Sequence, residues 1–193
     1  MATYEYGQQI WNGYMAIIKN EYGVAGLMGN QVAESGLIPY RVQGDNTPPY
    51  TFSQNYTLQV DNGTISENDF VHNGPNGGGY GLSQWTYYTR KQMLYDLHIQ
   101  RGVSIGDVKL AIDYTLYELQ TNYQSVYNIL INSTSIKEAS DAVLHDYENP
   151  AEQGPEVEDY RASLGQEIYD LYSGTGPSSK LPIWLYFQFN RRW

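Results

Sequence analysis

The sequence predicts an α+β fold that is mostly helical, with a small β sublobe and a long segment rich in Gly and Asn. Three observations predict this fold. Apolar residues recur at helical spacing in segments on both sides of a central region. Helical periodicity disappears between Gly36 and Tyr80, and inside that region two short segments with β-branched residues flank a turn sequence. The 193 residues suit one domain with one core.

Two helices are expected near the N-terminus. The first runs from Tyr6 to Asn20 and the second from Val24 to Ala33, after which Ser35-Gly36 supplies a stop signal. The spacing of large apolar side chains in both segments is that of a buried helix face. The residues that define these faces are Ile10, Trp11, Tyr14, Ile17, Ile18, Ala25, Leu27, Met28 and Val32.

The β sublobe is expected in the segment from Gly36 to Tyr80, which is dominated by Gly, Asn, Pro, Thr and Ser. A structureless loop of that length is rare in a compact domain. Two candidate strands, Thr57 to Val60 and Thr64 to Ile65, flank Asp61-Asn62-Gly63, which is typical of a hairpin turn. We therefore expect a hairpin at this place.

Helices are expected again up to Ser173, the first from Ser83 to Gln100 and the last beginning near Pro155. Pairs that resemble helix-starting caps are Ser104 with Asp107 and Ser135 with Glu138. The apolar stripe predicted for the last helix consists of Val157, Tyr160, Leu164, Ile168 and Leu171. A Gly/Ser/Pro sequence follows, so we expect a domain at 1–173 and a linker with an aromatic tail at 174–193.

Composition excludes several classes of protein. The chain has no cysteine, which rules out disulfides and thiol catalysis, and its net charge of −10 with scattered basic residues argues against nucleic acid as a partner.

No stretch approaches the ~20 apolar residues of a membrane span, and residues 1–7 lack the pattern of a signal peptide. His72, His98 and His145 are not at metal-ligand spacing, so we expect neither a metal nor another cofactor.

Glu34 is the first candidate for chemistry. It ends an apolar helix, where peptide dipoles disfavour negative charge, and a polar aromatic segment begins directly after it. Apolar packing and the dipole would raise the pKa of this carboxyl group, as a proton donor near neutral pH requires. The alternative is a solvated glutamate on the surface.

The second candidate is the glycine-rich segment 77–86, GGGYGLSQWT. Glycines let a backbone approach a ligand closely, while Gln84 offers both a donor and an acceptor and Trp85 offers a stacking face. The chain is also rich in Tyr (20 residues), and ring faces with hydroxyls suit a carbohydrate. The alternative is a turn leading into a helix, with Trp85 in the core and the Tyr rings as core filling.

Three segments taken together resemble the phage tail-type lysozyme family. They are AGLMGNQVAESG at 25–36, GYGLSQWT at 79–86 with Arg90-Lys91, and DYENP at 146–150. The resemblance covers Tyr4 to about Ser173. It implies a lysozyme-like fold for domain 1–173, with a cleft between a helical body and the β sublobe, and it implies that Glu34 is the catalytic acid. DYENP would be a structural turn lining the far side of the cleft.

The position of a second carboxylate departs from the family pattern. From Phe70 to Tyr95 there is no Asp or Glu, although related enzymes often place this carboxylate just before the Gly-Tyr-Gly segment. Asp69 is the nearest acid, and we assign it provisionally as the second carboxylate. We expect it at the wide separation from Glu34 that inverting hydrolases use. The alternative is that Asp69 only caps a turn. Other candidates are Glu67 and Asp61, followed by Asp45 and the segment after Gln84. The residues expected to bind substrate are Tyr80, Gln84, Trp85, Asn73 and Tyr147.

By this resemblance the chain is expected to hydrolyse the β-1,4 glycan backbone of peptidoglycan. Two alternatives stay open, a lytic transglycosylase that uses Glu34 alone as acid and base, and a noncatalytic wall-binding tail module. The expected partners are peptidoglycan glycan strands and other domains of a larger lysin or virion tail. The protein would be made in the host cytoplasm and act at the bacterial wall, carried by a virion or released through a holin lesion.

Overall fold

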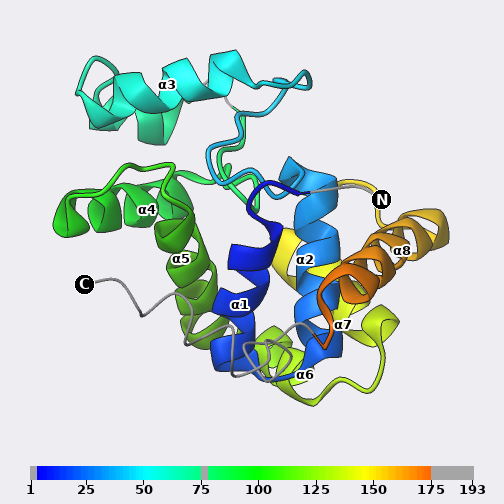
Figure 1. The fold of residues 1–193 in the computed structure, drawn as a ribbon. Helices are drawn as coiled ribbons and strands as arrows, with labels where there is room; N and C mark the ends of the chain where they lie inside the picture. The colour runs from blue at the N-terminus through cyan, green and yellow to red at the C-terminus, as the bar shows by residue number, and fades with distance from the viewer. Residues whose placement is uncertain (1–3, 75–77, 175–193) are drawn as a thin grey trace, which may run out of the picture.

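The computed structural model describes residues 4–74 and 78–174, and these residues are mostly helical, as predicted (Figure 1). The α-helices are α1 (Gly7–Ile18), α2 (Glu21–Ser35), α3 (Thr51–Asp61), α4 (Tyr88–Arg101), α5 (Val108–Thr121), α6 (Gln124–Asn132), α7 (Ile136–Ala142) and α8 (Pro155–Tyr172). Two π-helical segments are η1 (Asp69–Asn73) and η3 (Val143–Glu148). The predicted tail, apart from Gly174, lies outside the described residues.

Helix α2 is the central element of the body. It packs against α1, α6, α7, α8 and η3, and its residues from Gly23 to Gln31 are all buried. The side chain of Asn20 caps its N-terminus by accepting from the amides of Tyr22 and Gly23, and Gly36 ends it in the left-handed conformation. A helix that is buried on nearly all sides needs side chains that are apolar or, if polar, hydrogen-bonded. This requirement explains why the residues from Val24 to Gln31 are mostly small or apolar.

Helices α2 and α8 approach each other closely at two glycines. A Cβ atom added to Gly29 would lie 2.4 Å from the backbone nitrogen of Gly165. The close approach also sets which face of α8 is buried, namely Arg161, Gly165, Ile168 and Tyr172. The predicted stripe is therefore only partly right, because Ile168 belongs to it but Tyr160 is 58% exposed.

We expect Gly29→Ala to destabilise the fold by about 1–3 kcal/mol, because the added methyl group meets backbone atoms of α8 that cannot move aside separately. The free energy of unfolding in denaturant measures the change. Gly154→Ala is the matched control, since a Cβ there meets nothing within 4 Å. Equal effects of the two substitutions would show that the helix contact is not as close as described.

The predicted hairpin is wrong, because its first strand, Thr57 to Val60, lies inside α3. Ser53, Tyr56, Thr57 and Val60 are the buried residues of this helix, and their spacing is helical rather than alternating. In the described part of the chain, β pairing is limited to isolated bridges of Tyr80 with Val42 and with Trp85. The sublobe expected to be β is thus built from α3 and η1.

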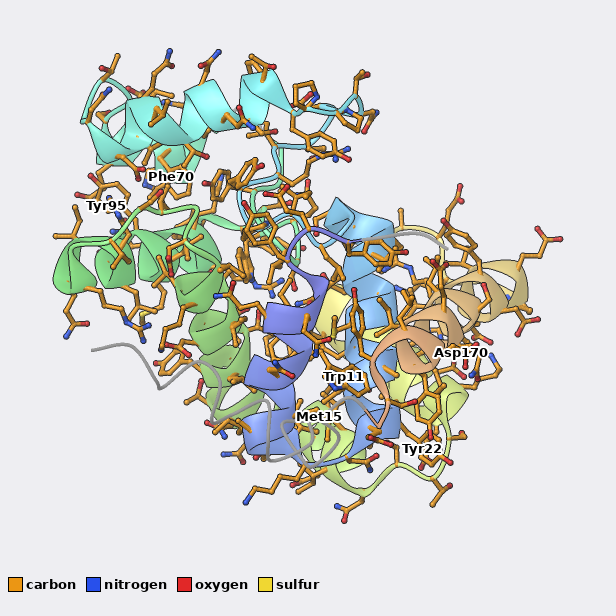
Figure 2. The ribbon with its side chains drawn as sticks, in the orientation of Figure 1. Trp11, Met15, Tyr22, Phe70, Tyr95 and Asp170 are labelled. Atoms are coloured by element: carbon orange, nitrogen blue, oxygen red, sulfur yellow. The ribbon has the colours of Figure 1, made fainter. Side chains whose placement is uncertain are left out.

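This small lobe is attached to the body by aromatic side chains. Phe70 of η1 lies 6.0 Å from Tyr95 of α4 and 5.4 Å from Tyr80, measured between ring centroids (Figure 2). The hydroxyl group of Tyr80 in turn shares a 2.7 Å hydrogen bond with Thr57 of α3. Tyr80 therefore connects the glycine-rich segment with the lobe.

The remaining predicted boundaries are confirmed in part. Asp107 and Ser135 cap α5 and α7 by accepting from the amides of Leu110 and Glu138. Ser104 instead donates to Asp61, at 2.6 Å, and so links the loop before α5 to the end of α3. The helix predicted from Ser83 begins only at Tyr88, because the segment before it forms the turns that line the site.

Candidate active site

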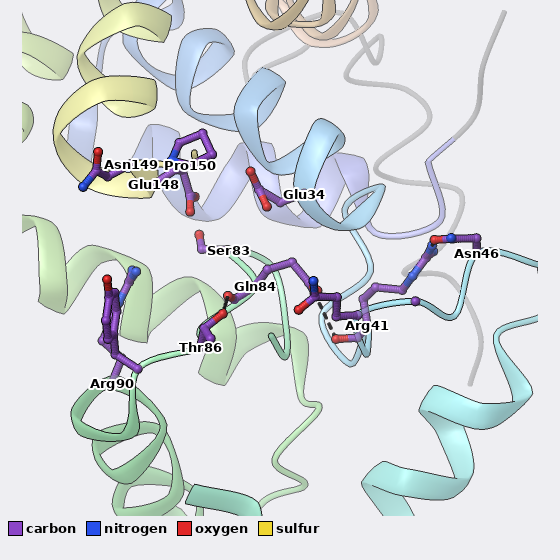
Figure 3. A pocket seen from close by; sticks show the side chains of 13 residues that line it. Glu34, Arg41, Asn46, Ser83, Gln84, Thr86, Arg90, Glu148, Asn149 and Pro150 are labelled. Atoms are coloured by element: carbon purple, nitrogen blue, oxygen red, sulfur yellow. Dashed lines mark hydrogen bonds between the residues drawn. The ribbon is translucent and has the colours of Figure 1, made fainter. Parts of the chain in front are cut away.

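The end of α2, the glycine-rich segment and the end of η3 surround a cavity of about 740 Å³ (Figure 3). Its wall carries carboxylates, amides, hydroxyls, two guanidinium groups and one aromatic ring. The lining residues are Glu34, Arg41, Gln43, Gly44, Asn46, Ser83, Gln84, Thr86, Tyr87, Arg90, Glu148, Asn149 and Pro150. A cavity of this size with several convergent polar groups is a candidate binding site.

Glu34 lines this cavity from the last turn of α2, and its side chain is 20% exposed. Its Oε1 atom accepts a 2.6 Å hydrogen bond from Nη2 of Arg161, and the same guanidinium donates to Oδ1 of Asn30 at 3.1 Å. The apolar packing expected from the sequence is thus not the only environment of this carboxyl group. A buried cation from α8 holds the carboxylate in position.

Glu148 is a second carboxyl group in the cavity, and the sequence analysis missed it. It ends η3, and Asn149 follows in the left-handed conformation. Burial raises the pKa of Glu148 to about 8, and the charge of Glu34 adds to the rise, whereas Arg90, Ser83 and Arg161 oppose it. The signal for it in the sequence is its place in the DYENP segment, for which the sequence analysis predicts only a turn.

Gln84 lies on the cavity wall as predicted. Its backbone has a φ of 42°, and its Nε2 atom donates to the carbonyl oxygens of Gly81 (2.9 Å) and Arg41 (3.1 Å). These bonds tie the glycine-rich segment to the segment that follows α2. Gln84 therefore lines the cavity and also holds two segments of the cavity wall together.

Tyr80, Trp85 and Tyr147 do not reach the surface of the cavity, because each is at most 2% exposed. Trp85 Nε1 and the Tyr147 hydroxyl both donate to Oε2 of Glu118, at 2.7 and 2.8 Å. Trp85 and Tyr147 form the floor beneath the cavity, and Tyr80 is buried beside Trp85, to which it is joined by a β-bridge. None of the three lines the cavity wall, where the sequence predicted them to contact substrate. For Trp85 the core alternative is the one that the structure shows.

Glu118 of α5 is the polar centre of that floor and is 1% exposed. Besides Trp85 and Tyr147, it accepts from Arg90 through both oxygens, with Nε at 2.6 Å and Nη2 at 2.8 Å. Arg90 also lies over the ring of Tyr147, 4.8 Å from its centroid. One buried carboxylate therefore fixes the floor rings and the arginine beside the cavity.

Asp69 and Asn73 are not brought to the cavity. Asp69 begins η1, is exposed, and accepts hydrogen bonds from Ser66 and Asn73, which lower the pKa of its carboxyl group, with Ser66 contributing most. This corresponds to the turn-capping alternative. Glu67, Asp61 and Asp45 do not line the cavity either. Asp61 accepts from Ser104 and from the Ile105 amide, Glu67 accepts from Gln92, and Asp45 accepts from Ser53.

Tyr87 and Arg41 are among the further cavity residues that the sequence analysis missed. Tyr87 is 73% exposed on the wall, directly before α4. Arg41 donates to Asn46 at 3.1 Å, and its guanidinium lies 4.1 Å from the ring centroid of Tyr50. Exposed Tyr and Arg side chains give no periodic signal in a sequence, so only their positions in the fold show that they belong to the cavity.

The described residues contain no group of three or more His, Cys, Asp or Glu side chains that could hold a metal ion. Among the helices of residues 4–74 and 78–174, none has the length and apolar character needed to cross a membrane.

A family model described as phage tail lysozyme matches residues 5–172, from the segment before α1 to the end of α8. The match includes Glu34, Gln84 and Glu148, and so every side of the cavity. No curated protein matches the sequence.

Proposed function

This chain belongs to the phage tail lysozyme family, whose function is the lysis of peptidoglycan, and we propose that it hydrolyses the β-1,4 glycan backbone of the bacterial wall. The observation that carries the proposal is the position of Glu34. It ends the central helix, lines a polar cavity of about 740 Å³, and belongs to the segment through which the chain resembles the family.

In the proposed reaction Glu34 is the general acid. It donates a proton to the glycosidic oxygen while the bond from that oxygen to the anomeric carbon breaks, and the electron pair stays on the oxygen. Water then forms a bond to the anomeric carbon and loses a proton. The contact with Arg161 fixes the direction in which this carboxyl group points.

The wall of the cavity supports a carbohydrate substrate. Gln43, Asn46 and Gln84 place side-chain amides around it, and Ser83 and Thr86 add hydroxyl groups. Such groups bind sugar hydroxyls, while an exposed ring binds the apolar face of a sugar. The cavity is thus suited to a glycan strand.

Product analysis after digestion of purified Gram-positive walls tests the proposal. Hydrolysis gives reducing ends that contain oxygen from water, which mass spectrometry in ¹⁸O-labelled water detects. Anhydro ends would instead indicate the lytic transglycosylase, and wall binding without any cleavage would indicate the noncatalytic tail module. The identity of the reducing sugar also distinguishes a muramidase from a glucosaminidase.

The protein acts at the cell wall by virtue of its family. We further propose that it reaches the wall from the host cytoplasm, either as a virion part or through a holin lesion, and that other lysin or tail domains accompany it. Wall lysis from outside intact cells by purified virions, compared with lysis only after membrane disruption, distinguishes the two routes.

Tyr87→Ala is expected to weaken substrate binding roughly twofold to tenfold, because an aromatic contact of this kind is worth about 0.5–1.5 kcal/mol. The substitution should raise KM for soluble glycan fragments more than it lowers kcat. Tyr88→Ala is the matched control, since Tyr88 is 59% exposed but lies outside the cavity wall. Similar KM values for the two variants would remove Tyr87 from the binding surface.

A further inference from the structure

We propose that Glu148 is the second catalytic carboxyl group of the cavity and that Glu34 and Glu148 hold one proton between them. The inference rests on the proposed function, because it concerns the same cavity and the same reaction. It replaces the provisional assignment of Asp69, which is absent from the cavity wall. It also gives a role to the DYENP segment beyond that of a turn.

The first support is the position of the two side chains. Glu34 extends from the end of α2 and Glu148 from the end of η3, and both point into the space beside Ser83 (Figure 3). The elements that carry them are in contact, since α2 packs on η3 and α8. Two carboxyl groups of different elements thus reach one cavity, as an acid and base pair requires.

The second support is an unsatisfied atom. Oε1 of Glu148 is buried and has no hydrogen-bond partner within residues 4–74 and 78–174. A buried polar atom without a partner is costly, and a catalytic role is one reason for a protein to keep such an atom. Because this atom belongs to a group on the cavity wall, a water molecule or sugar hydroxyl in the cavity is a suitable partner.

The third support is the set of charges around Glu148. Glu34 faces it from α2, Tyr14 from α1, Arg90 from α4 and Arg161 from α8, besides its neighbour Tyr147. Both guanidinium groups are already paired, Arg90 with Glu118 and Arg161 with Glu34. Burial and the charge of Glu34 together therefore outweigh them, and the raised pKa of about 8 keeps a proton on the pair at neutral pH.

With these two carboxyl groups and water, the catalytic cycle needs no other proton donor or acceptor. In the reactive state the shared proton is on Glu34, which donates it to the glycosidic oxygen as the bond to the anomeric carbon breaks. Both carboxylates are now ionised beside the positive anomeric centre. A water molecule attacks that carbon with its lone pair and gives a proton to Glu148, which restores the starting state. Glu34 provides the acid, and Glu148 stores the proton and acts as the base.

Glu148→Gln tests the proposal in the full chain. We expect kcat for wall digestion to fall about 100-fold, with glycan binding retained, because an amide can neither store the proton nor accept one from water. Asp146→Asn is the matched control, since Asp146 is an exposed carboxylate of the same segment and lies outside the cavity wall. Thermal unfolding of both variants shows whether the fold is retained.

The pH profile separates a catalytic role from a structural one. A carboxyl group with a raised pKa carries its proton below that pKa and loses it above, so wild-type activity should fall as pH rises through about 8. In Glu148→Gln the residual activity should lack this alkaline fall. An unchanged profile, or activity within about threefold of wild type, would overturn the proposal.

The same assays distinguish its failure from that of the proposed function. A wild-type protein that releases no glycan fragments contradicts the function itself. A wild type that is active and a Glu148→Gln variant that is equally active contradict only the second carboxyl group. If Asp69→Asn is inactive while Glu148→Gln is active, the role returns to Asp69.

Discussion

Glu34→Gln should abolish wall lysis, with a loss of roughly two to four orders of magnitude in kcat. The amide keeps the shape of the side chain but cannot donate a proton to the glycosidic oxygen. Folding should survive, because the amide oxygen can still accept the hydrogen bond that Arg161 donates to Glu34. Turbidity loss of purified walls, followed by product analysis, measures the effect.

The matched control is Glu156→Gln, which changes an exposed glutamate at the start of α8, far in sequence from Glu34 and outside the cavity wall. It should leave lysis unchanged. If Glu34→Gln keeps more than about a tenth of wild-type activity, Glu34 is not the general acid. Binding of glycan fragments to the inactive variant would further show that the cavity is intact.

The largest loss of stability is expected for Glu118→Ala. This substitution leaves the guanidinium of Arg90 without its carboxylate, and it also removes the acceptor of Trp85 and Tyr147. Breaking a buried ion pair from one side costs about 3–5 kcal/mol, because the remaining charge stays in the interior. For a domain of this size the melting temperature should fall by roughly 6–20 °C.

Asp113→Ala on the same helix is the control for Glu118→Ala. Asp113 pairs with Arg101 and Lys109, each at 2.6 Å, but it lies near the surface, where such pairs contribute about 0–1 kcal/mol. Denaturant unfolding of both variants gives the comparison. Equal destabilisation would mean that the network under the cavity floor contributes no more than surface ion pairs do.

The sequence predicted the end of α2 well because a long apolar helix with a glycine stop is a local signal. It failed for Thr57 to Val60, where β-branched residues beside Asp61-Asn62-Gly63 favoured a hairpin. The structure forms α3 there, since Tyr56 and Val60 share a buried helix face over Tyr80. Contacts with a distant segment decided between two local preferences.

Within the site, sequence placed Glu34 and Gln84 at the cavity but not their partners. Asp69 was selected because it is close to the glycine-rich segment along the chain, whereas the carboxyl group that shares the cavity is Glu148. Trp85 was expected to stack on substrate, but its acceptor Glu118 lies in α5, 33 residues away, and draws the ring inward. Such long-range pairs leave no periodic pattern.

The ion pair between Glu34 and Arg161 also determines when the site can exist during synthesis. The two residues are 127 positions apart, and Arg161 lies on α8, the last described helix. A nascent chain that has not yet released α8 from the ribosome carries Glu34 without the cation that orients it, and the face of α2 around Gly29 is still uncovered. Translation products that end before α8 therefore lack a finished site, so the proposed lytic activity requires that α8 has been synthesised.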